Sequence, residues 1–454
     1  MFTFVQIIDK MKAISPFLFI GIFCFSMIAH AQNYVKTYTG TGYPGLLNGA
    51  LAIAKFNAPF GMCMDKNRNI YVADKDNNCI RKISADGIVS TYAGAKTAGY
   101  VDGPAADARF KEPASMCVDS IGNLYVCDFG NHRIRKITPD GMVSTIAGSG
   151  VGGYANGQGT AAKFNCPRGI CRDNKGNLYI GDSWNHRIRK ITPDGMVSTY
   201  AGGGDTIGVQ SVGHYRDAPD TLARFYTPCE VKIDAQKNIY VADAYTHRIR
   251  KIDSNRVVST VAGSGFIGQQ TGGFEDGAAN QARFNVPTSV FVAHDGALYV
   301  GDGINQRVRK ISNGTVSTFA GTGNSGFEDG IDTAASFDFP RAVVEDASLG
   351  LFYVIDYNNH AIRSIGAQNT TKVNKLAVTT LEVWPNPVQK TLNIRGLETG
   401  NNELLLTDIA GKTFLQKQVQ ANEISVNLPE LPKGLYVLKV IHAQAVSTVK
   451  ILVD

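Results

Sequence analysis

Three charged side chains occupy positions where a repeated segment otherwise carries uncharged residues. The segment occurs six times, and each copy contains a proline at the same position. Arg168 and Arg341 follow that proline directly, and Glu230 stands two residues after it. An arginine presents a forked set of donors that matches a carboxylate. These three residues predict a binding site for an anionic or zwitterionic ligand, unless they pair with one another or face solvent.

Aromatic residues recur at a second place in the repeat, shortly after its second apolar segment. They are Phe129, Trp184, Tyr245 and Tyr357. Such side chains can stack against sugars or anchor a peptide. The alternative is that they pack against the neighbouring copy. With the three charged residues they form the candidate ligand-binding set.

The repeat itself supplies a template against which these exceptions stand out. The prolines are Pro59, Pro113, Pro167, Pro228, Pro287 and Pro340. Each copy also has an aspartate at the end of an apolar run (Asp74, Asp128, Asp182, Asp243, Asp302, Asp356) and an arginine seven residues later (Arg81, Arg135, Arg189, Arg250, Arg309, Arg363). His132, His186, His247 and His360 share one position. Because these residues recur, we expect them to be scaffold, with Asp and Arg paired inside each copy.

One copy reads as four short antiparallel strands, at 115–119, 124–128, 133–138 and 142–147, with a Pro-Asp-Gly turn before the last. A unit of this size cannot bury its apolar faces alone, so six of them predict an all-β protein containing a six-bladed β-propeller. The segment Tyr34 to Gly40 resembles the last strand of other copies and is expected to complete the sixth blade. In this arrangement, the residues where the first strands begin and the second strands end lie on the same face of the ring.

The repeat resembles the NHL repeat, on Asn131-His132-Arg133, Asn185-His186-Arg187 and Asn359-His360-Ala361. The resemblance covers the propeller, which we place at 32–366. It implies the propeller fold strongly. It leaves function open, because NHL propellers serve as enzymes, RNA binders and protein-binding platforms.

Related propellers include zinc-dependent lyases and lactonases, so catalysis at the central mouth is the alternative function. Within the propeller, the histidines outside the template are His214 and His294, which are expected on opposite faces, and Glu230 is one carboxylate. Neither set makes a zinc or calcium site. We therefore expect a binding protein without catalytic residues, metal or cofactor. The net charge of +6 is too small to indicate a nucleic-acid partner.

Residues 378–454 are predicted to form a small Ig-like β-sandwich after a linker at 367–377. This module resembles the C-terminal sorting domain of type IX secretion cargo in Bacteroidota. The residues that carry the resemblance are Pro385, Asn386, Pro387, Gly434, Tyr436 and Lys450. It implies the type IX machinery as a partner, transit through the periplasm, and a final place outside the cell or on its surface. The other partner is an extracellular protein, peptide or glycan.

Residues 1–31 have the pattern of a secretory signal peptide, with Met11 as the expected start and Ala29-His30-Ala31 before the cleavage point. No later run is long enough for a transmembrane helix. Seven cysteines follow residue 31, so at least one thiol should be unpaired. Cys63, Cys117 and Cys171 share one repeat position and are expected to be small buried residues.

Overall fold

The computed structural model describes residues 32–203, 205–207, 210–268, 271–367, 381–397, 401–408, 412–442 and 445–453. The proposed signal peptide and most of the proposed linker lie outside these residues. The chain divides into two compact units at residue 368, which are described separately. Within the described residues, no helix is long and apolar enough to cross a membrane.

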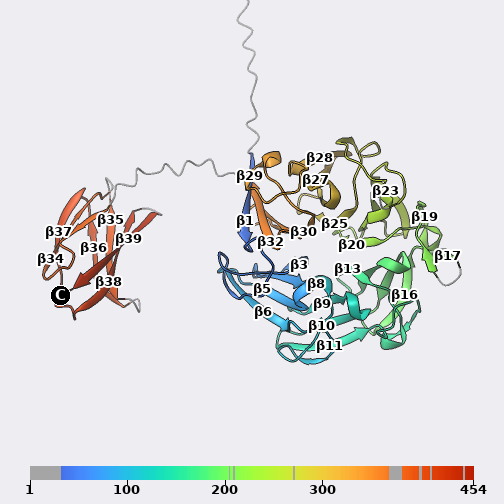
Figure 1. Ribbon diagram of the computed structural model, residues 1–454, viewed down its shortest axis with the longest axis horizontal. Coiled ribbons are helices and arrows are strands. Elements are labelled where there is room, and N and C mark those ends of the chain that lie inside the picture. The colour runs from blue at the N-terminus through green and yellow to red at the C-terminus, as the bar shows by residue number, and fades with distance from the viewer. Residues whose placement is uncertain are drawn as a thin grey trace, which may run out of the picture. The chain divides into compact units, whose positions relative to one another are not determined.

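The first unit is a ring of six antiparallel sheets (Figure 1). The inner strands are β3 (Pro59–Met64), β8 (Pro113–Val118), β13 (Pro167–Arg172), β20 (Pro228–Ile233), β25 (Pro287–Val292) and β30 (Pro340–Asp346). The second strands are β4 (Ile70–Asp74), β9 (Leu124–Asp128), β14 (Leu178–Asp182), β21 (Ile239–Asp243), β26 (Leu298–Asp302) and β31 (Leu351–Asp356). The third strands are β5 (Cys79–Ile83), β10 (Arg133–Ile137), β15 (Arg187–Ile191), β22 (Arg248–Ile252), β27 (Arg307–Ser312) and β32 (Ala361–Ala367). The fourth strands are β6 (Ile88–Gly94), β11 (Met142–Ala147), β16 (Met196–Ala201), β23 (Val257–Ala262), β28 (Thr315–Ala320) and β1 (Asn33–Thr39).

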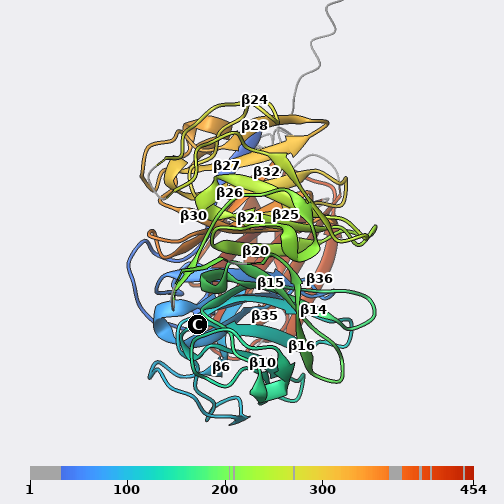
Figure 2. The same ribbon diagram turned by 90° about the vertical axis from the view of Figure 1, so that its right-hand side faces the viewer.

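Each sheet has five strands rather than the expected four. The fifth is a two-residue strand on the outer edge: β2 (Gly49–Ala50), β7 (Gly103–Pro104), β12 (Gly157–Gln158), β19 (Ala218–Pro219), β24 (Gly277–Ala278) and β29 (Gly330–Ile331). The connection to the next blade contributes this strand, and it covers the otherwise open edge of the fourth strand. Figure 2 views the ring from its edge, and blade four, which contains β20, faces the viewer.

The two ends of the propeller sequence meet in one blade. Strand β1 pairs with β32, with Tyr34 opposite Gly366, and its other edge pairs with β29. Blade six is therefore built from both ends of the propeller sequence. This non-covalent closure leaves no sheet edge open between the first and last repeats.

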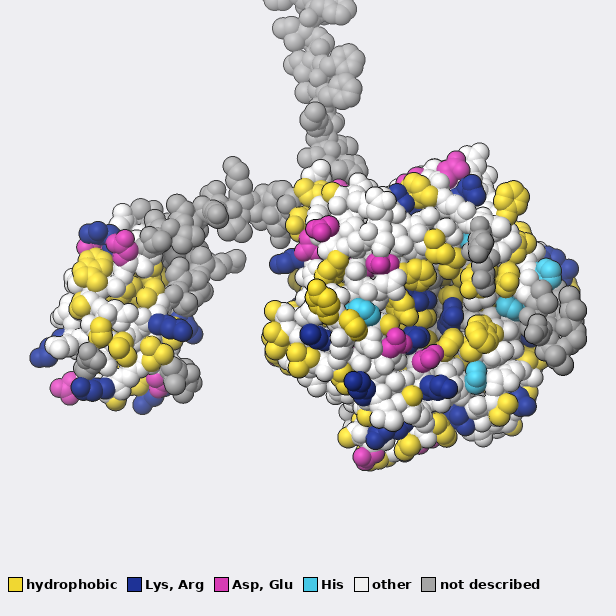
Figure 3. Space-filling view, viewed as in Figure 1, with side chains coloured by type: hydrophobic (Ala, Val, Ile, Leu, Met, Phe, Trp, Pro, Cys, Tyr) yellow, Lys and Arg dark blue, Asp and Glu magenta, His cyan; other side chains and the backbone are white. Residues whose placement is uncertain are grey.

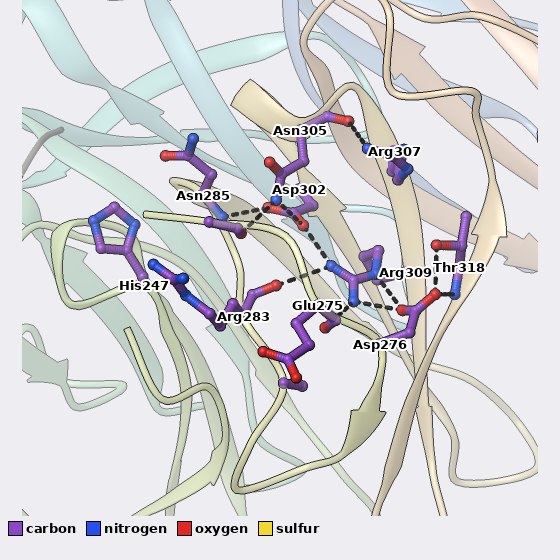
Figure 4. Close-up of polar contacts among 12 residues, drawn as sticks. His247, Glu275, Asp276, Arg283, Asn285, Asp302, Asn305, Arg307, Arg309 and Thr318 are labelled. Carbon is purple, nitrogen blue, oxygen red and sulfur yellow. Dashed lines mark hydrogen bonds and ion pairs between the residues drawn. The ribbon is translucent and has the colours of Figure 1, made fainter. Parts of the chain in front are cut away.

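Ion pairs inside the blades fix each sheet to its connecting loops. Each template arginine donates from Nη1 to the template aspartate at 2.7–3.0 Å, and both side chains are fully buried. In blade five, Arg309 also bonds Asp276, while the other oxygen of Asp302 accepts from the backbone N–H of Asn285 (Figure 4). The expected Asp–Arg pairing is thus present in all six blades.

The template histidines connect each blade to the next. The residue at this position is left-handed in every blade, and its side chain accepts a hydrogen bond from the backbone N–H before the next template proline. The acceptors are Asn78, His132, His186, His247, Gln306 and His360, at 2.6–3.1 Å. We call these bonds the inter-blade latches. The histidines are scaffold, and each accepts through Nδ1, which requires a neutral ring with its proton on Nε2.

The latches should make the propeller less stable below about pH 6.5. Burial lowers the pKa of His132, His247 and His360 below the ordinary value, and Lys111 and Arg133 lower that of His132 further. The unfolded chain then takes up protons first as the pH falls, so the stabilisation is fully present above about pH 6.5 and disappears through the lower native pKa values. Urea unfolding between pH 5 and 8 measures this loss, about 1 kcal/mol per latch.

The chain contains its own control for this titration. Gln306 forms the same latch in blade five without a titratable group. The triple variant His132→Gln, His247→Gln and His360→Gln should keep the latches and lose the part of the pH dependence that they cause. Identical pH profiles for the variant and the natural chain would contradict the role of these histidines.

The second unit is a two-sheet β-sandwich, in agreement with the expected architecture. One sheet contains β33 (Glu382–Trp384), β34 (Thr391–Arg395) and β37 (Glu423–Asn427). The other contains β35 (Asn402–Asp408), β36 (Thr413–Val419), β38 (Gly434–His442) and β39 (Ala445–Val453). Buried side chains from both sheets, including Leu392, Ile394, Leu404, Leu438 and Ile451, form its single core.

Residues of the proposed sorting motif hold the last strand of the sandwich in place. Asn386, between Pro385 and Pro387, donates from Nδ2 to the carbonyl of Lys450 at 2.9 Å. Its Oδ1 accepts from the N–H of Leu452 at 2.8 Å. Gly434 begins β38, and the Tyr436 hydroxyl donates to the carbonyl of Pro432 at 2.9 Å. The motif therefore positions β39.

Candidate functional site

The candidate site lies on the face of the ring where the inner strands begin. The turns after the second strands share this face, because the latches join them to the residues before the template prolines. We call the centre of this face the mouth. Figure 3 shows basic side chains in the hollow at the centre of the ring, with hydrophobic side chains around them. The sequence-predicted set lies around this mouth.

Arg341, at the start of β30, lies in a nest of aromatic rings. It is 7% exposed. Its Cζ lies 3.6 Å from the ring centre of Phe60, 5.0 Å from that of Tyr357 and 5.3 Å from that of Phe339. Burial, and secondarily the charge of Arg168, lowers the pKa of Arg341 to about 10. The aromatic faces attract the cation and partly offset its loss of hydration.

Arg168, at the start of β13, belongs to blade three and therefore lies across the ring from Arg341 in blade six. Its Nη1 donates to Cys229 Sγ at 3.3 Å, and its Cζ lies 5.3 Å from the ring centre of Phe129. Its Nε is buried and has no hydrogen-bond partner among the described residues. The two arginines therefore face the mouth from opposite blades.

Glu230 is engaged below the arginines. Its Oε1 accepts from Ser115 Oγ at 3.0 Å and lies 3.1 Å from Lys232 Nζ. Ser115 belongs to blade two and Glu230 to blade four, so this contact passes in front of blade three, on the side of the channel. Lys232 compensates the carboxylate locally. Within the predicted trio, the structure leaves the two arginines, and not Glu230, available to a ligand.

The aromatic residues form the rim of the mouth. Phe129 and Trp184, from the short turns Phe129–Asn131 and Ser183–Asn185, pack edge to face at 6.4 Å. Tyr245 packs edge to face against Tyr226 at 5.2 Å. Trp184 is 52% exposed, whereas Phe129, Tyr245 and Tyr357 are half-buried. These aromatic rings therefore pack against neighbouring blades and also present part of their surface to a ligand.

Several residues that complete the site were not among the predicted ones. Phe60 and Phe339 hold Arg341, Cys229 contacts Arg168, and Ser115 and Lys232 engage Glu230. Lys232 could have been found from the sequence, because it departs from the template at a position where three other blades have a cysteine. Phe339 could not, since the residue before the template proline differs in every copy.

A separate cavity of about 310 Å³ opens at the other end of the channel. Cys63, Cys117 and Cys171 line it together with Lys232 and Phe291. Burial raises the pKa of the Cys117 thiol to about 12. All seven described cysteines are free, and no group of three or more His, Cys, Asp or Glu in the described ranges could hold a metal ion.

Comparison with known families finds a match in each unit. The sequence matches the NHL repeat at residues 56–83, 110–137 and 164–191, which are parts of the first three blades. It matches the secretion system C-terminal sorting domain at residues 382–454. The sorting domain indicates export by type IX secretion to the cell surface or beyond it.

Individual relatives align with part of this chain. The chain is 28% identical over 363 residues to the protein SUPPRESSOR OF QUENCHING 1, chloroplastic, of Arabidopsis thaliana, covering 75% of this chain and 32% of that protein. It is 28% identical over 316 residues to human NHL repeat-containing protein 2, covering 62% and 43%. The chain thus spans less than half the length of these relatives.

Solved structures from Bacteroides have the same propeller fold. A protein of unknown function from Bacteroides thetaiotaomicron superposes with a TM-score of 0.56 at 21% identity, covering 74% of this chain and 76% of that one. An auxiliary nutrient binding protein from the same organism gives 0.55 at 18% identity, with the same coverage.

Proposed function

We propose that this chain, which carries NHL repeats and a C-terminal secretion sorting domain, is an exported binding protein. Its propeller captures an extracellular protein, peptide or glycan at the mouth. The observation that carries the proposal is the mouth itself, where Arg168 and Arg341 face each other inside an aromatic rim that includes the exposed Trp184. Aromatic and arginine side chains that line a hollow are typical of residues that dominate binding energy.

Export gives this binding site its setting. The sorting domain directs the chain through the type IX machinery, so the mouth meets its ligand outside the outer membrane. The ring is rigid, since each blade has a buried ion pair and each junction a latch. A rigid ring can hold the mouth residues in place without ordering them when the ligand binds.

The rim should carry the binding energy. In Trp184→Ala, we expect capture from peptide and glycan arrays by the full chain to fall about tenfold or more, as for a central aromatic anchor. The matched control is Ile121→Ala, which removes a side chain that is 74% exposed in the turn between β8 and β9, on the opposite face. Array signal and its titration in solution provide the measurement.

Two outcomes would contradict the proposal. If Trp184→Ala lost no more capture than the control Ile121→Ala, the binding site would not include the rim of the mouth. Stoichiometric zinc or calcium in the purified chain, removed by changes at the mouth, would favour the alternative lyase or lactonase activity.

A further inference from the structure

Arg341 differs from the template arginines in having no bonded partner. Each template arginine is neutralised by a buried aspartate at 2.7–3.0 Å. Among the residues that the structure describes, no carboxylate or carbonyl oxygen bonds the Arg341 guanidinium, although this side chain is only 7% exposed. A buried guanidinium whose donors are unused is unfavourable unless something else satisfies it. The aromatic nest supplies attraction but no hydrogen-bond acceptor.

Arg168 adds a second cation with unused donors. Its Nε is buried without a partner, and its one side-chain bond goes to the sulfur of Cys229, a weak acceptor. The carboxylate of Glu230 does not neutralise the pair by direct contact, because it bonds Ser115 and Lys232 beneath. Within the described ranges, the mouth therefore contains two guanidinium groups that no carboxylate bonds directly.

We propose that the C-terminal carboxylate of a peptide with an apolar last side chain binds between Arg168 and Arg341. The inference deepens the proposed function and rests on it. A carboxylate offers acceptors to both forks. A chain end is favoured because the Ser115–Glu230 contact joins blades two and four below the arginines and narrows the channel there.

The rim favours a peptide over a sugar. Phe129 and Trp184 are inclined at 84°, Phe60 and Tyr357 at 89°, and Tyr245 meets its neighbour at 79°. These rings do not form one flat platform of the kind that stacks on a sugar. They present a half-buried apolar wall that suits an aliphatic or aromatic side chain.

The test compares free acids with amides. The probes are N-acetyl-Gly-Ala-Xaa tripeptides in which Xaa is Phe, Leu, Val or Ala, each as the free acid and as the C-terminal amide, with D-glucuronate as the sugar acid. We expect at least one acid to bind the full chain, by calorimetry, about tenfold or more tightly than its amide. Arg168→Gln and Arg341→Gln should each remove this preference. Lys175→Gln, which changes an exposed lysine on the opposite face, should keep it.

A stability measurement separates a binding role from a structural one. Removing a buried cation that has no bonded partner should leave the melting temperature of Arg341→Gln equal to that of the natural chain or raise it. A large fall in melting temperature would identify Arg341 as a structural residue and overturn the inference.

The remaining outcomes distinguish the two levels of the proposal. Equal binding of acids and amides that is still lost in Trp184→Ala overturns the carboxylate inference and leaves the proposed function standing. Binding of glucuronate without binding of any tripeptide overturns the peptide assignment. Binding of none of the probes overturns the inference, whereas the array experiment decides the proposed function independently.

Discussion

Asp182→Asn is expected to destabilise the propeller by about 3–5 kcal/mol, the range for a buried ion pair that loses one partner. Asp182 and Arg189 are both fully buried and lie 2.8 Å apart. The other side-chain partner of Arg189 is the amide oxygen of Asn156. Without Asp182, the guanidinium stays buried with no carboxylate in contact. Urea unfolding of the propeller, followed by circular dichroism, measures the change.

Blade five provides the matched comparison. Arg309 bonds Asp302 at 2.8 Å and also Asp276, whose oxygen lies 2.5 Å from its Nη2. Asp302→Asn therefore leaves one carboxylate in place, and we expect a smaller loss of about 1–3 kcal/mol. Asp107→Asn, which alters an exposed aspartate, should change stability by less than about 0.5 kcal/mol.

The order of these three effects tests the cause. If Asp182→Asn and Asp302→Asn cost the same, the outer carboxylate contributes nothing, and the loss would come from the hydrogen bonds that both aspartates accept. Those bonds are equivalent in the two blades, from the N–H of Asn165 to Asp182 and from that of Asn285 to Asp302.

Recurrence explains why so much of the scaffold could be predicted from the sequence. A pair such as Asp128 and Arg135 recurs six times at one spacing, on neighbouring strands, and any misassignment would have failed in the other copies. The likeness of the segment beginning at Tyr34 to other fourth strands likewise pointed to the pairing of β1 with β32. The two-residue outer strands were not predicted, because a pair such as Gly49–Ala50 is too short to show a periodic pattern.

The contacts inside the mouth could not be predicted in the same way. Glu230 meets Ser115 from a blade two positions away, and this contact depends on the curvature of the whole ring. The nest around Arg341 combines Phe60 of blade one with Phe339 and Tyr357 of blade six. Departure from the template identified the charged residues of the mouth, but the partners of each charge follow only from three-dimensional packing.

The same contrast separates stability from recognition in this molecule. Each template arginine bonds a buried carboxylate within the chain, so its charge is compensated, although the Nε of Arg189 lacks a hydrogen-bond partner just as that of Arg168 does. Arg168 and Arg341 are enclosed and poorly satisfied, which lowers stability and leaves donors for a partner. Strained or unsatisfied groups of this kind are expected at functional sites rather than in the scaffold.

Removal of residues 382–454 is expected to abolish appearance of the protein outside the cell, in a bacterium that has type IX secretion. The matched domain lies within these residues, and a propeller without it lacks the sorting signal for passage through the outer membrane. The truncated chain should accumulate in the periplasm with its propeller folded. Cell fractionation and surface protease accessibility measure the distribution, and a periplasmic marker protein controls for lysis.

A point variant tests whether the sorting function depends on the position of β39 in the sandwich. Asn386→Ala removes the two hydrogen bonds that fix β39, at 2.9 Å and 2.8 Å, and leaves the propeller untouched. Each bond is worth about 1 kcal/mol, so the last strand should loosen and export should fall without being lost completely. Thr391→Ala, on β34, removes a side-chain bond to Asn427 at 2.9 Å without touching β39, and is the control. Normal export of the 382–454 deletion would refute the sorting role. Loss of export in the deletion but not in Asn386→Ala would show that recognition does not depend on the position of β39.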